Sequence, residues 1–113
     1  MKYDLEDRTE RFAANCRNLI RKTKPSLSNA DDLKQLLRSS GSVAANYIEA
    51  NESLSKKDFR YRVKICKKEA KESRLWLRLV YISEPQSAKM RDHLIDECGQ
   101  LIKIFASIIA KTG

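Results

Sequence analysis

Apolar and small residues recur at alternating steps of four and three along the stretch from Ser55 to Ile82. On a helix of about 100° per residue they fall on one line, which consists of Phe59, Val63, Cys66, Ala70, Ser73, Leu77 and Val80. This period is typical of a helix that buries one face in a bundle. No glycine or proline interrupts the stretch, and the whole chain has only three glycines and two prolines. The stretch predicts one long helix, and the composition argues against many strands and turns.

Three further segments share this helical period, and short polar or proline-containing breaks separate all four. The expected limits are Asp4 to Thr23, Asn29 onward, Ser55 to Ile82 and Ser87 to Lys111, with Asn29, Ser55 and Ser87 as N-caps. Four amphipathic helices with short connectors predict a single all-α domain over residues 1–113. The default arrangement is an antiparallel up-down-up-down four-helix bundle.

The inner faces of the other helices follow from the same periodicity. The expected inward residues are Leu5, Phe12, Cys16 and Leu19 in the first helix and Leu33, Leu36, Leu37, Ser40, Val43, Ala44, Tyr47 and Ile48 in the second. The fourth helix has a wide apolar face made of Leu94, Ile95, Cys98, Leu101, Ile102, Phe105, Ile108 and Ile109. The run from Ser39 to Ala45 is almost entirely small, which favours the close approach of a partner helix over a binding site.

A second line of the third helix is made only of basic residues. We call Arg60, Lys64, Lys67, Lys71, Arg74 and Arg78 the basic ridge, and Lys56 and Lys57 lie at its start. Like charges at i,i+4 repel each other by a few tenths of a kcal/mol per pair. Such a row suits the phosphates of RNA or DNA, with contacts that tolerate any sequence and weaken steeply with salt. A solvated ridge, or one that faces acids of another protein, is the alternative. Arg17, Arg21, Lys22 and Lys24 could extend the basic surface.

A third line lies on the other flank of the same helix. It contains Ile65, Glu69, Glu72 and Trp76, with Tyr61 and Leu79 near its edge. A core helix with a second apolar flank usually meets another helix, because Trp76 and Leu79 are costly to leave in water. We interpret this flank as a subunit interface of a homo-oligomer, and contact with a loop of the same chain is the plainer alternative.

Polar residues of the second helix could meet the acids of the third. A network of Arg38, Asn46 and Glu49 with Glu69 and Glu72 would fix the register of the two helices. An acidic binding pocket is the functional alternative, and we favour the structural role.

The sequence supports no catalytic, cofactor or metal site. It has one histidine, His93, no Glu-x-x-His motif and no glycine-rich phosphate loop. The three cysteines, Cys16, Cys66 and Cys98, are widely spaced within apolar stripes, where a free thiol acts as a small hydrophobe. We therefore expect no enzyme activity, no cofactor and no metal. A cytoplasmic location fits these cysteines and the acidic N-terminal segment, and no apolar run is long enough to span a membrane.

The central segments also carry a family pattern. The residues concerned are Arg38-Ser39, Ser42-Val43, Ala45-Asn46, Glu49, Ser55 and Asp58-Phe59, followed by Lys68-Glu69-Ala70, Glu72-Ser73 and Trp76-Leu77-Arg78-Leu79. The stretch from Leu36 to Val80 thus resembles the four-helix bundle proteins related to those encoded by intervening sequences of bacterial large-subunit (23S) rRNA genes. The family usually has glycine where Ala50 stands here. The resemblance implies an antiparallel bundle that assembles into a ring-like homopentamer without enzyme activity.

The formal net charge of +8 favours an anionic partner. We expect a non-enzymatic, homo-oligomeric protein that binds RNA or DNA without sequence specificity through basic surfaces. An interaction scaffold or accessory subunit that contacts an unidentified protein, and no nucleic acid, is the alternative.

Overall fold

The structure, a computed structural model, describes residues 4–113 and consists of four α-helices. They are α1 (Leu5–Lys22), α2 (Leu27–Asn51), α3 (Lys56–Leu79) and α4 (Pro85–Thr112). The described part of the chain contains no strand, which confirms the all-α prediction. The first three residues of the acidic N-terminal segment lie outside the described residues.

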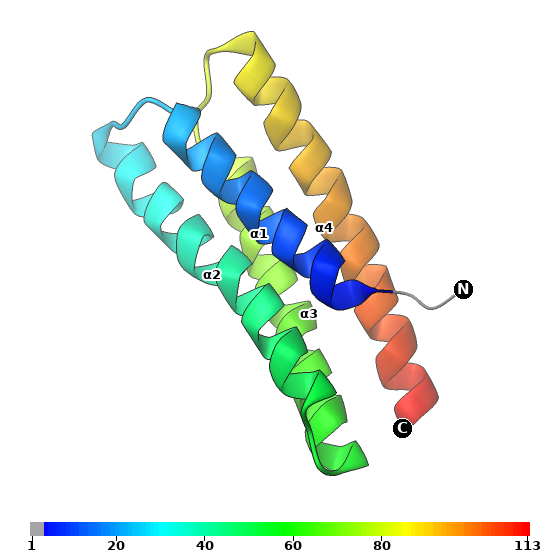
Figure 1. Cartoon of the computed structure of the whole chain (residues 1–113). Helices are drawn as coiled ribbons and strands as arrows, with labels where there is room; N and C mark the ends of the chain where they lie inside the picture. Colours follow the sequence, from blue (N-terminus) through cyan, green and yellow to red (C-terminus); the bar gives the residue numbers. More distant parts are fainter. Residues whose placement is uncertain (1–3) are drawn as a thin grey trace.

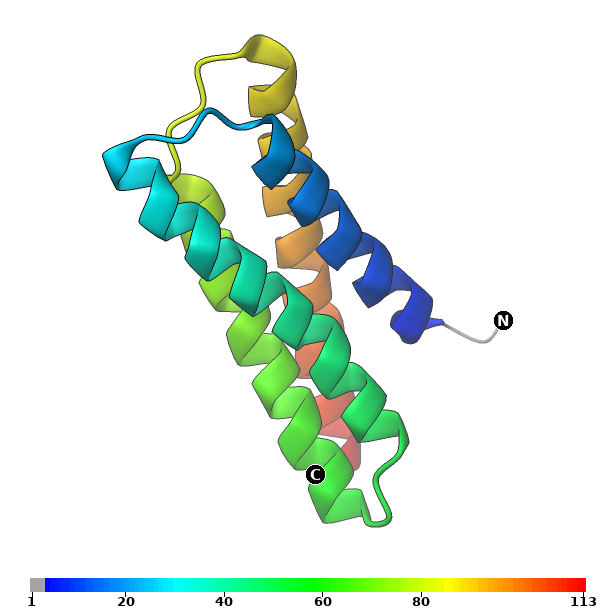
Figure 2. The ribbon, with the colours of Figure 1, turned by 60° about the vertical axis from the view of Figure 1, so that its left-hand side comes forward.

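The four helices lie side by side (Figure 1). The α1–α2 and α3–α4 connections lie at one end of the molecule and the α2–α3 connection at the other (Figures 1 and 2). Each helix packs against two neighbours: α2 lies between α1 and α3, and α3 lies between α2 and α4. Hydrogen bonds join Asn29 to Tyr81 and Arg38 to Glu69, so residue numbers rise along α2 as they fall along α3.

Two helix starts agree with the sequence. The Ser55 hydroxyl accepts a hydrogen bond from the backbone N–H of Asp58 at 3.0 Å, which confirms Ser55 as the N-cap of α3. Asp4 likewise accepts from the backbone N–H of Asp7 at 3.1 Å and caps α1. Each cap satisfies a backbone donor that the first turn of a helix leaves without a partner.

Two predicted N-caps are wrong. Ser26, not Asn29, caps α2, and the carboxylate of Glu84, not Ser87, accepts from the first turn of α4. Asn29 is buried instead, and its amide bonds both backbone groups of Tyr81, at 2.7 Å to the carbonyl oxygen and 2.9 Å from the N–H. Because these bonds need extended backbone after Val80, α3 ends at Leu79 rather than at Ile82.

The buried core follows the predicted lines with few exceptions. All four expected inward residues of α1 are buried, as is the α3 line from Val63 to Val80. Leu37 and Ile48 of α2 were expected to face inward, but 41% and 51% of their surfaces are exposed. They lie just outside the buried stripe, and Ser39 and Ala50 are buried in their place.

The small residues of α2 allow two close contacts. The hydroxyls of Ser39 and Ser73 meet at 2.8 Å between α2 and α3, and both side chains are fully buried. On the α1 side, a Cβ added at Gly41 would lie 2.9 Å from Nη2 of Arg17. The run from Ser39 to Ala45 therefore serves helix packing, as the sequence indicated.

Candidate nucleic-acid interface

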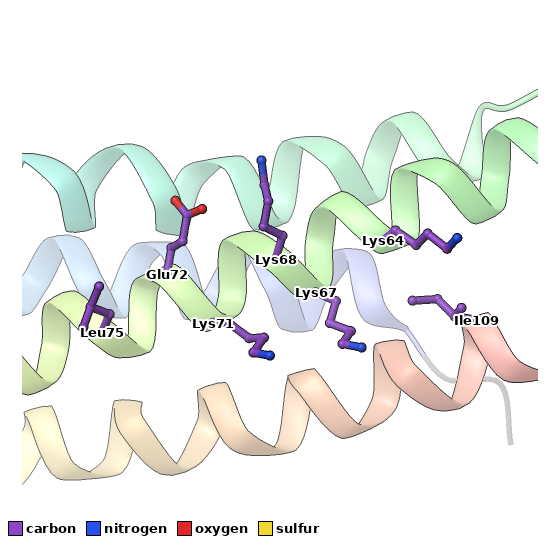
Figure 3. A pocket seen from close by; sticks show the side chains of 7 residues that line it. All are labelled: Lys64, Lys67, Lys68, Lys71, Glu72, Leu75 and Ile109. Carbon is purple, nitrogen blue, oxygen red and sulfur yellow. The ribbon is translucent and has the colours of Figure 1, made fainter.

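The basic ridge lies along α3 on the side of α4. Lys64, Lys71 and Arg78 are exposed, whereas Arg60, Lys67 and Arg74 are half-buried. In Figure 3, Lys67 and Lys71 extend toward α4, whereas Lys68 and Glu72 extend toward α2. Lys56 and Lys57, in the first turn of α3, are exposed. The residues predicted as one line thus share one side of the folded helix.

The ridge has no carboxylate partner among residues 4–113. The ion pairs in this part of the chain use Arg8, Arg11, Arg38, Arg62, Lys68 and Arg91, none of which belongs to the ridge. Arg60 donates instead to a backbone carbonyl, from its Nε to the oxygen of Ile109 at 3.3 Å. The positive charge of the ridge is therefore not neutralised by direct ion pairs within the described residues.

The far end of the ridge lies close to a buried thiol of α4. Burial raises the pKa of Cys98, and the charges of Arg74 and Arg78 act in the opposite direction. Burial also raises the pKa of Cys16 and of Cys66 to about 12 each. All three thiols are buried and unpaired, so they behave as small core residues rather than as nucleophiles.

A shallow groove of about 530 Å³ runs beside the ridge (Figure 3). Leu75 of α3 and Ile109 of α4 supply its apolar surface, and its other lining residues are Lys64, Lys67, Lys68, Lys71 and Glu72. The nucleic-acid site predicted from the sequence did not include Leu75, Lys68 or Ile109. Leu75 follows Lys64, Lys68 and Lys71 at helical steps and could have been found from the pattern, whereas Ile109 requires knowledge of how α4 packs.

Two of the three acidic residues of α3, Glu69 and Glu72, bind one arginine of α2. Nη2 of Arg38 lies 3.3 Å from the carboxylate of Glu69 and 3.1 Å from that of Glu72. Only 7% of the Glu69 side chain is exposed, and its second oxygen lies 3.7 Å from Nζ of Lys68. These contacts separate the acids of α3 from the ridge.

The predicted register network divides into two parts. Arg38 binds Glu69 and Glu72, while Asn46 and Glu49 meet Arg62, at 3.2 Å to the Asn46 amide oxygen and 3.9 Å to the Glu49 carboxylate. The sequence did not predict that Arg62 joins this network, because nothing in the pattern distinguishes its partners from those of the neighbouring basic residues. Both parts bridge α2 and α3.

The predicted interface flank has mixed exposure. Glu69 is buried, Ile65, Glu72 and Trp76 are half-buried, and 56% of the Leu79 surface is exposed. The indole nitrogen of Trp76 is buried and finds no acceptor within the described residues. The exposed apolar side chains of α3 are Tyr61, Leu75 and Leu79, and the role of this flank in subunit contact stays a prediction.

The basic residues of α1 do not continue the ridge. Arg17 bonds the carbonyl oxygen of Ala13 and lies 3.4 Å from the Ser40 hydroxyl, while Arg21, Lys22 and Lys24 are exposed. They belong to α1 and its following connection, and α1 packs on α2 and α4 but not on α3.

Two further searches cover residues 4–113. No group of three or more histidine, cysteine, aspartate or glutamate side chains is placed to hold a metal ion there. None of the helices in that range combines the length and the apolar character needed to cross a membrane.

Replacement of Arg38 by alanine should lower the free energy of unfolding by about 1–2 kcal/mol. The buried carboxylate of Glu69 would then keep only the distant Lys68. Arg11→Ala is the matched control, because its partner Asp7 is exposed, and it should cost less than about 0.5 kcal/mol. Urea denaturation of both variants measures the difference, and equal losses would contradict a special role for Glu69.

Comparison with known proteins identifies the family. The chain is similar to a structure of a protein of unknown function from the S23 ribosomal protein family of Bacteroides thetaiotaomicron VPI-5482, with 29% sequence identity and a TM-score of 0.76. The similarity covers 92% of this chain and 96% of the other. A search of curated proteins finds no match. The sequence model of the 23S rRNA-intervening sequence proteins matches residues 2–107, and the chain therefore belongs to this family.

Proposed function

We propose that the chain forms an antiparallel up-down-up-down bundle, assembles as a homopentamer and binds RNA or DNA without sequence specificity through the basic ridge. The observation that carries this proposal is the row of six cations on α3, for which no ion pair occurs in the described part of the chain. Nucleic acid is the anionic polymer whose repeated charges match a repeated row of cations.

The energetics of the ridge favour such a ligand. Neighbouring cations on one helix face repel each other, and a phosphate placed between two of them removes that repulsion. The two acids in the middle of α3, Glu69 and Glu72, are bound instead to Arg38 of α2. An external anion would therefore supply the negative charge that residues 4–113 do not place beside the ridge.

The character of the ridge also favours tolerance of sequence. Lysine forms point-charge contacts with phosphates, and such contacts position a nucleic acid without reading its bases. Half of the ridge is lysine, and Lys56 and Lys57 extend it at the start of α3. We therefore expect affinity to depend on salt far more than on base sequence.

Joint replacement of Lys64, Lys67 and Lys71 by glutamine should weaken binding of a fluorescent RNA hairpin at least tenfold, by an order-of-magnitude estimate from lost phosphate contacts. The slope of log affinity against log salt should fall by about 2 to 3. Fluorescence anisotropy at several salt concentrations measures both values, and circular dichroism checks that the helices persist.

The matched control replaces Lys34, Lys89 and Lys103 by glutamine. These lysines are all exposed and belong to α2 and α4 rather than to the ridge, so the same loss of charge should change affinity far less. If both triple variants weaken binding equally, net charge rather than the ridge governs it. If the unchanged protein does not bind the hairpin at micromolar concentration and low salt, the nucleic-acid proposal fails.

A protein partner is the second candidate, and the groove beside the ridge favours it. Leu75 is 45% exposed and, with Ile109, gives the groove an apolar surface that phosphates do not need. An acidic partner with apolar side chains would suit such a surface. A partner that stays bound after nuclease treatment, and is lost in Leu75→Gln but not in the lysine triple variant, would favour this candidate.

The homopentamer is testable through its mass. Light scattering should give about five times the 13.0 kDa mass of the chain. Leu79→Glu should lower that mass without loss of helix signal, because Leu79 is mostly exposed and contributes little to the fold of one chain. A monomeric unchanged protein would contradict both the assembly and the interface role of the flank that contains Trp76.

A further inference from the structure

We propose that the basic ridge selects double-helical nucleic acid over single strands. This inference rests on the proposed function and adds the class of its ligand. Three properties of α3 carry it: the cations form one row, the row is held straight, and no aromatic side chain stands at its centre.

The cations form a single narrow row. Lys68, the basic residue just outside the row, extends to the α2 side with Glu72 (Figure 3) and lies 3.7 Å from the carboxylate of Glu69. The row from Lys64 to Arg78 spans about 21 Å at about 1.5 Å per residue. A narrow row of this length follows one line of phosphates rather than enclosing a strand in a channel.

The row is also rigid. The opposite side of α3 is buried between α2 and α4 through Val63, Cys66, Ala70, Ser73 and Leu77, so the helix axis cannot bend freely. A duplex is stiff over far greater lengths, about 50 nm for DNA, and its phosphates already lie at fixed spacing. A single strand would have to lose conformational freedom to match the same row.

Single-strand binders usually add aromatic side chains on which bases stack, and the ridge lacks these at its centre. Among residues 4–113, the exposed aromatic side chains are Tyr61 and Tyr81, near opposite ends of α3 and about 30 Å apart by helical rise. The nearest aromatic to the middle, Trp76, is half-buried on the other flank, and its indole nitrogen is buried. Tyr61, one turn before Lys64, therefore offers a base a stacking surface at one end of the row, and the centre of the row offers none.

The test compares four RNAs in one anisotropy titration of the full chain. They are a blunt duplex, each of its two strands alone, and a single strand of twice the length that carries as many phosphates as the duplex. The duplex should bind about tenfold more tightly than the long single strand. The bases of the single strand have no aromatic side chain to stack on at the centre of the row, and each such stack would contribute about a factor of ten. Lys64→Gln with Lys67→Gln and Lys71→Gln should remove that preference.

Tyr61→Ala provides a second readout. The duplex affinity should change less than about twofold, whereas loss of a stacking contact would weaken single-strand binding about tenfold. If the long single strand binds as tightly as the duplex, or if Tyr61→Ala weakens duplex binding tenfold, the duplex inference is wrong and the proposed function stands. If no RNA binds, both are wrong.

Discussion

The buried line of α3 determines where every other side chain of that helix points. Val63, Cys66, Ala70, Ser73 and Leu77 are fully buried between α2 and α4. Ala70 and Ser73 are the small members of this line, and the hydroxyl of Ser73 meets that of Ser39 of α2 at 2.8 Å. Because a helix rotates by about 100° per residue, burial of this line fixes the basic ridge on one flank and the acids on the other.

The separation of charge across α3 follows from that rotation. The helix contains ten basic and three acidic residues, and Arg38 of α2 binds two of the three acids. The same contacts that hold α2 against α3 thus remove carboxylates from the side of α4. The ridge is left without an ion-pair partner in the described residues, and both proposals for the ligand depend on this imbalance.

The sequence predicted the helices, the buried lines and the shared side of the ridge, because all three depend on local periodicity. The sequence-based prediction was wrong where one side chain could form either of two sets of hydrogen bonds. Asn29 and Ser26 are both good N-caps, and only the position of Tyr81 in the fold shows that Asn29 is used elsewhere. Arg62 and the apolar surface of Ile109 depend on how helices meet, so no pattern within one helix could reveal them. Leu37 and Ile48 were wrongly predicted to face inward for a related reason. The buried stripe of α2 includes the small residues Ser39 and Ala50 in their place.

The claim that the ridge faces outward in the assembled protein can be measured directly by amine labelling of its lysines, read by mass spectrometry. Lys64 and Lys71 should react as readily as Lys34 and Lys103 in the free assembly, because all four are exposed in the single chain, and a bound RNA duplex should protect only the ridge. Ridge lysines that stay unreactive in the free assembly, or that react equally with and without the duplex, would contradict the account.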